Sequence, residues 1–194
     1  GPPSPALSER QKVALFAQTS VRPEEARAMA DADITFERLV ESGCRPENCY
    51  AADVFPAQLA RLGARAAGEL RRLGFWSLHL VDPVFCAQAN AVYGADEVVA
   101  AFLCTAGDAV CVAGSDAVHT LGLTVARLLE LCAGAPLEAA SVLEQCAGPN
   151  VLDGVTVNMI MSTGLRAKML HDLGFSAKSF EACADREAVS ELGF

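Results

Sequence analysis

Basic residues are almost missing from the middle of this sequence. The chain of 194 residues has 15 Lys and Arg against 24 Asp and Glu, a net charge of −9. Residues 1–72 hold 10 basic and 10 acidic side chains, residues 73–165 hold one and nine, and residues 166–194 hold four and five. Because a nucleic-acid surface needs clustered Lys and Arg, this distribution argues against nucleic acid as a partner.

A long uninterrupted apolar run is missing as well. The longest, Val98 to Gly107, ends before Asp108, whereas a membrane-spanning helix needs about 20 residues. Hydrophobic residues still make up 52% of the chain, which excludes a disordered polypeptide. We therefore predict no membrane span, and we expect part of residues 73–165 to be covered by another protein or by a second copy of the chain.

Motifs that bind metals or cofactors are also missing. None of the eight cysteines forms a Cys-x-x-Cys pair, and there is no phosphate-binding loop or Gly-x-Gly-x-x-Gly run. We predict no metal and no cofactor. The cysteines are interpreted as reduced core thiols, with disulfides or a metal as the alternative, and reduced thiols favour an intracellular, cytoplasmic location.

What the sequence does contain is a recurring short motif: an apolar residue, two others, Leu, Gly, and then a small or apolar residue. An apolar pair three residues apart marks one face of a helix, and the Gly supplies the left-handed conformation that ends it. The residue after the Gly is expected to pack back onto the last turn. The predicted corner residues are Gly63, Gly74, Phe75, Gly122, Leu123, Gly174, Phe175, Gly193 and Phe194.

This motif predicts an all-α fold. We expect an array of short helices joined by Leu-Gly corners, either a small α-solenoid or a compact multi-helix domain. Residues 109–113 and 157–161 are predicted to be helical, although a short buried strand is an alternative at both places.

The chain is expected to have three parts. Residues 1–7 look like a tag remnant followed by a disordered end, because Gly1-Pro2 lacks an initiator Met, which also suggests a fragment of a larger protein. Residues 8–55 lack a clear Leu-Gly corner and are predicted to form an N-terminal helical cap or subdomain. Residues 56–194 are predicted to form a short-helix repeat domain.

One copy of the motif resembles a known family. The string Leu170-x-x-Leu173-Gly174-Phe175-Ser176 is similar to a corner of the mitochondrial transcription termination factor family, helical-repeat proteins that bind nucleic acid. The resemblance covers this one short motif, and the function of that family is not carried over to this chain; a helical-repeat RNA-binding module is kept as the second of two alternatives. The basic groove of that family has no counterpart in the charge-poor central segment.

The first alternative is a small enzyme or ligand-binding domain. Ser115, Asp116 and His119 lie close to Cys111 in the sequence, and together they offer a nucleophile, an acid and a base. The competing interpretation is that Ser115 or Asp116 caps a helix and His119 faces solvent.

The leading hypothesis is a non-enzymatic protein-protein interaction or scaffold module. Trp76, directly after a helix stop, is a candidate interface anchor, because Trp is enriched at binding hot spots. The only basic cluster is a second candidate contact, with Arg61 and Arg65 expected on one helix face. Its members are Arg61, Arg65, Arg71 and Arg72.

Overall fold

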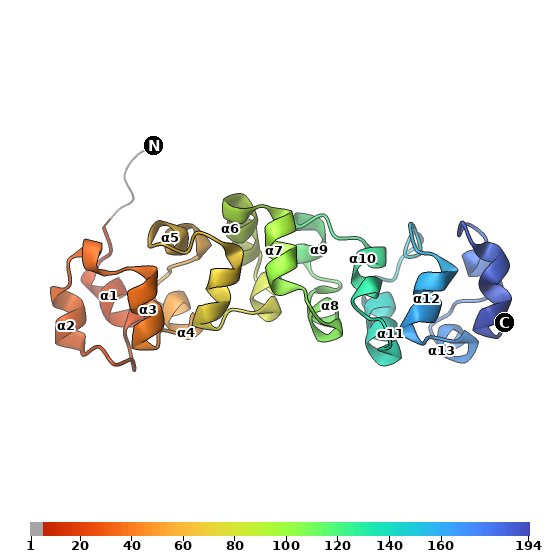
Figure 1. Ribbon diagram of the computed structural model, residues 1–194, viewed down its shortest axis with the longest axis horizontal. Helices are drawn as coiled ribbons and strands as arrows, with labels where there is room; N and C mark the ends of the chain where they lie inside the picture. The colour runs from red at the N-terminus through yellow and green to blue at the C-terminus, as the bar shows by residue number, and fades with distance from the viewer. Residues whose placement is uncertain (1–5) are drawn as a thin grey trace. The chain divides into compact units, whose positions relative to one another are not determined.

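The protein is all-α, and the fold is described from a computed structural model covering residues 6–194 (Figure 1). The expected tag remnant at residues 1–7 falls mainly outside the described residues. Within residues 6–194 there are thirteen α-helices, five 3₁₀ helices and no strand. Where a strand was the alternative, residues 109–112 lie in α8 and residues 157–161 in α12, so the prediction of helix is confirmed at both.

The chain divides into two compact units, the first ending at Ala101 and the second running from Phe102 to Phe194. The boundary expected near residue 55, between a cap and a repeat domain, stays a prediction. The helices up to the division are α1 (Glu9–Leu15), α2 (Pro23–Ala28), η1 (Asp31–Asp33), α3 (Phe36–Ser42), α4 (Pro46–Ala51), α5 (Pro56–Arg61), η2 (Ala67–Leu73), η3 (Ser77–Val81), α6 (Pro83–Tyr93) and α7 (Ala95–Phe102).

In the first unit the helices pack as neighbouring pairs. α1 contacts α2 and α4, α3 contacts η2, and α6 contacts both α5 and η3. Each helix is too short to bury its apolar face alone, so the core is assembled from one to three residues of every helix except η1, which has none. Its largest buried side chains are Leu15, Phe16, Ile34, Phe36, Leu39, Leu59, Leu70, Leu73, Phe75 and Phe85.

The second unit is built in the same way. α8 packs on α11, α10 contacts α8, α11 and α12, and η5 packs on α12 and η4. Its core includes Leu128, Val142, Leu143, Ile160, Leu170 and Phe180. Its helices are α8 (Ala106–Val112), α9 (Asp116–Thr120), α10 (Val125–Glu130), α11 (Pro136–Gln145), α12 (Val157–Thr163), α13 (Ala167–Asp172), η4 (Ala177–Phe180) and η5 (Arg186–Leu192).

The predicted corners are present. Every predicted corner glycine has positive φ, from +62° at Gly122 to +124° at Gly63. In four of the five motifs the residue after the glycine donates its backbone N–H to the carbonyl five residues earlier, the bond that defines a Schellman motif. These bonds are Ala64 to Leu59 (2.9 Å), Phe75 to Leu70 (3.4 Å), Leu123 to Val118 (2.8 Å) and Phe175 to Leu170 (2.9 Å).

The same corner also occurs where the Leu-Gly signature is weak or missing. Cys44 donates to the carbonyl of Leu39 (3.0 Å), and Val54 donates to that of Cys49 (2.9 Å). In the second case Asp53, with φ +54°, occupies the left-handed position that glycine holds elsewhere. Asp tolerates this conformation better than most residues, so a search for glycine alone overlooks the corner.

The helices begin at residues that favour a helix start. Ser8 and Gln11 form a reciprocal capping box, with Ser8 N–H to Gln11 Oε1 at 2.9 Å and Gln11 N–H to Ser8 Oγ at 3.1 Å. Proline occupies the first position of α2, α4 and α11.

Candidate interaction surface

Large apolar side chains on the surface gather in one short stretch of the first unit. Seven large hydrophobic side chains are exposed among residues 6–194, and four of them lie between residues 76 and 84. Their exposed fractions are 45% for Trp76, 50% for Leu78, 37% for Val81 and 52% for Val84. We call residues 76–84 the Trp76 segment. Six of the seven fall within the charge-poor residues 73–165.

The 3₁₀ geometry of η3 explains this exposure. Residues three apart lie on one side of a 3₁₀ helix, which has three residues per turn. Ser77 and Leu80 form the buried side of η3. Leu78 and Val81, each one position further along, form the neighbouring row, about a third of a turn away, and face solvent. Apolar residues therefore lie both in the buried row and in an exposed row of this short helix.

His79 holds the start of this segment in place. Its Nδ1 accepts the backbone N–H of Trp76 at 3.0 Å. Its ring centroid lies 5.1 Å from that of Phe75, 6.0 Å from Phe85 and 6.1 Å from Tyr50. Burial lowers the pKa of His79 below its ordinary value. A neutral imidazole is required at this position, because protonation of Nδ1 would remove the acceptor of the Trp76 N–H.

A second polar contact supports the other end of the segment. Asp82 accepts the backbone N–H of Val84 at 2.9 Å and so caps α6. Burial, together with the nearby Asp82 carboxylate, raises the pKa of the Tyr50 hydroxyl. The exposed apolar residues thus lie on a backbone fixed at both ends.

The basic cluster does not form one site. Arg72 makes a two-pronged ion pair with Glu37, at 2.5 and 3.0 Å, which lowers the pKa of that carboxyl. Arg71 donates to the carbonyl of Ala101 at 3.2 Å. Two of the four guanidinium groups are therefore engaged in holding the first unit together.

The expected pairing of Arg61 with Arg65 is wrong. α5 ends at Arg61, and Gly63 turns the chain in the left-handed conformation before Arg65 is reached. The two residues consequently do not share a helix face. Both side chains are exposed.

The candidate catalytic residues are neighbours in the second unit, without a catalytic arrangement. Ser115, Asp116 and His119 line a cavity of about 540 Å³. Ser115 Oγ donates to the carbonyl of Val112 at 2.6 Å and accepts the N–H of Ala117 at 3.3 Å, so its hydroxyl caps α9. His119 is exposed.

The thiol lining this cavity belongs to Cys146, while Cys111 does not line it. Burial raises the pKa of Cys146, so its thiol is protonated rather than activated as a thiolate. A nucleophile needs a base within hydrogen-bonding reach, and the contacts of Ser115 lead to backbone groups instead. The geometry therefore gives no support to the enzymatic alternative.

The cysteines are free thiols, and those at 44, 49, 86, 132 and 183 are buried. In residues 6–194 no group of three or more His, Cys, Asp or Glu side chains could hold a metal ion. No helix in the part of the chain that the structure describes is long and apolar enough to cross a membrane.

Sequence reasoning identified Trp76 but missed Leu78, Val81 and Val84. A signal was present: Leu78, Val81 and Val84 follow one another at three-residue spacing, and Asp82 is the single acid between residues 76 and 84. A comparison with protein-family models, curated proteins and solved structures found no match to this chain. The class is therefore defined by its fold, an all-α protein of short helices, together with an exposed apolar segment.

Proposed function

We propose that this protein is a non-enzymatic interaction module that binds a partner protein through the Trp76 segment. One observation carries the proposal: four of the seven exposed large hydrophobic side chains lie within these nine residues. Scattered exposed apolar residues are common on protein surfaces, whereas several gathered together are typical of a binding surface.

The composition of the segment supports a protein as the partner. Trp is among the residues most enriched at binding hot spots, and the interior of an interface is poor in charged groups. The segment contains one acid and no Lys or Arg, so it lacks the groups that would attract nucleic acid or an anionic membrane.

The rigidity of the segment also favours binding. Its backbone is fixed by the bond from the Trp76 N–H to His79 and by the cap that Asp82 provides. A surface that is already ordered loses little conformational entropy on association. The recurring corners fix how each short helix follows the one before it. We infer that the chain is a helical-repeat scaffold that carries this binding surface.

The test is a pair of variants that add the same charge at different places. Leu78→Asp with Val84→Asp changes the Trp76 segment, and Leu137→Asp changes an isolated exposed Leu on α11, which is 74% exposed. Immobilised wild-type chain and both variants are compared for the proteins they retain from source cells. Sedimentation equilibrium of the purified chains shows whether the partner is a second copy of the chain.

We expect one protein, or a second copy of the chain, to bind the wild type and Leu137→Asp but not the double variant. Retention that is the same for all three chains, together with a wild type that stays monomeric, would contradict the proposal. Circular dichroism of each variant shows whether the helical content is kept.

A further inference from the structure

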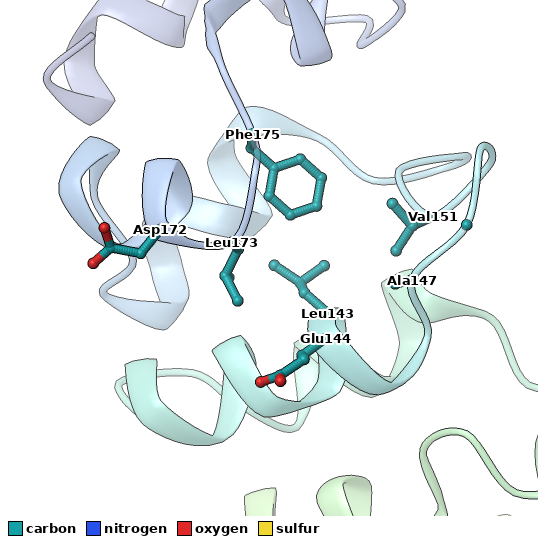
Figure 2. A pocket seen from close by; sticks show the side chains of 8 residues that line it. Leu143, Glu144, Ala147, Val151, Asp172, Leu173 and Phe175 are labelled. Atoms are coloured by element: carbon teal, nitrogen blue, oxygen red, sulfur yellow. The ribbon is translucent and has the colours of Figure 1, made fainter.

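The second unit contains a cavity that the Trp76 segment does not explain. It has a volume of about 450 Å³ and lies between the end of α11, the chain that follows it and the corner after α13 (Figure 2). Pockets that bind ligands start at about 300 Å³, so this one is large enough for one or two side chains of a partner. Its lining residues are Leu143, Glu144, Ala147, Gly148, Val151, Asp172, Leu173 and Phe175.

Four of the residues that line the cavity are large and apolar. Figure 2 shows Leu143 on α11 facing Leu173 and Phe175 from the corner after α13, with Val151 on the other side. The Phe175 backbone is fixed by its Schellman bond to Leu170 (2.9 Å), and its ring lies 6.3 Å from that of Phe180. The apolar wall is therefore part of a corner and is formed before any ligand arrives.

Two acidic residues also line this cavity. Glu144 lies on α11 and Asp172 at the end of α13, and both are exposed. In Figure 2 the Asp172 carboxylate points away from Leu143, Val151 and Phe175. Neither acidic residue takes part in an ion pair among residues 6–194. This holds even for Asp172 and Lys168, which is one helical turn away. The second unit as a whole has 5 basic and 11 acidic residues.

We propose that this cavity binds a peptide segment of a partner protein in which an apolar side chain stands next to Lys or Arg. The apolar side chain would displace water from Leu143, Val151 and Phe175, which supplies the affinity. The neighbouring cation would be attracted by the exposed side chains of Glu144 and Asp172, neither of which forms an ion pair among residues 6–194, and this attraction supplies the selectivity. An acidic segment of the same shape would be repelled. The proposal concerns the second unit and is independent of the Trp76 segment.

Three dipeptide probes that differ only in charge provide the test. Acetyl-Phe-Arg-amide, acetyl-Phe-Gln-amide and acetyl-Phe-Glu-amide are titrated into the ¹⁵N-labelled full chain. We expect the amide shifts to concentrate at residues 143–151 and 172–175. The affinities should fall in the order Arg, Gln, Glu, by roughly two- to fivefold per step, as for exposed charge pairs.

Three variants locate the binding. Glu144→Gln with Asp172→Asn should reduce the affinity for the Arg probe to that for the Gln probe. Glu181→Gln with Glu191→Gln removes the same charge from exposed positions elsewhere in this unit and should leave the order intact. Ala147→Phe adds a ring at an exposed lining position and should abolish binding of every probe.

Equal affinity for the three probes, shifts centred outside the cavity, or the same loss with both charge variants would overturn the proposal. Because Ala147→Phe changes packing, its fold is checked by circular dichroism, and the charge variants test the proposal without it. Leu78→Asp with Val84→Asp should leave binding of the dipeptide probes unchanged. The test of this cavity and the test of the Trp76 segment can therefore fail separately.

Discussion

The same substitution, glycine to alanine, should have opposite effects at two places in the second unit. Gly174 ends α13 with φ +90°, and open space surrounds the position that a Cβ would take. An L-residue in this left-handed conformation costs about 1–2 kcal/mol. Gly107 lies inside α8, where a Cβ would meet only Thr105 Oγ1 at 3.6 Å, an ordinary contact. Alanine is favoured over glycine inside a helix by about 0.5–1 kcal/mol.

The two variants should therefore differ by about 1.5–3 kcal/mol in the free energy of unfolding, with Gly174→Ala below the wild type and Gly107→Ala above it. The difference isolates backbone conformation, because neither new methyl group meets a close neighbour. Urea unfolding followed by circular dichroism at 222 nm measures it. If Gly174→Ala were as stable as Gly107→Ala, the explanation of the corners by left-handed glycines would be refuted.

Two further predictions concern the first unit. The pKa of His79 in the folded protein lies below its ordinary 6.5, so as the pH falls His79 is protonated in the unfolded chain before it is protonated in the folded protein. The free energy of unfolding should therefore decrease below about pH 6.5. Gln58 accepts the Phe55 N–H at 3.1 Å, so a glutamine in place of His79 can accept the Trp76 N–H in the same way. His79→Gln should therefore weaken the dependence of stability on pH. Urea unfolding midpoints between pH 7.5 and 5.5 measure this. The Asn48 side chain donates to the carbonyls of Ala14 (3.1 Å) and Ala17 (2.8 Å). Asn48→Ala should therefore lower the free energy of unfolding by about 1–3 kcal/mol, because both acceptors lose their partner. Thermal unfolding measures the loss, and an unchanged melting temperature would contradict this role of Asn48.

The helical architecture could be predicted because its information is local. The turn at Gly174 depends on backbone freedom at one residue and on apolar residues within one helical turn, both visible in the sequence. The corner at Asp53 was missed because a less common residue performs the same task. Likewise, the helix face predicted for Arg61 and Arg65 ignored the stop that Gly63 places between them.

The candidate surface could be predicted only in part. Trp76 stood out by residue type, but exposure depends on which side of η3 meets the core, and that is decided by packing against α6. The cavity at Phe175 is harder still to predict from the sequence, because its walls come from segments about 30 residues apart that the corners bring together. Spacing also placed Ser115 next to His119, but it could not show that the serine hydroxyl is used as a helix cap.

Site-specific photocrosslinking can show directly whether the Trp76 segment binds a partner protein. A photoreactive phenylalanine analogue replaces Leu78 in one chain and Leu137 in another, and both are expressed in the cells of origin. Both positions are exposed leucines, Leu78 at 50% and Leu137 at 74%. We expect a discrete protein adduct from position 78 and none from position 137. No adduct from position 78, or identical adducts from both positions, would contradict the claim that the Trp76 segment is a binding surface.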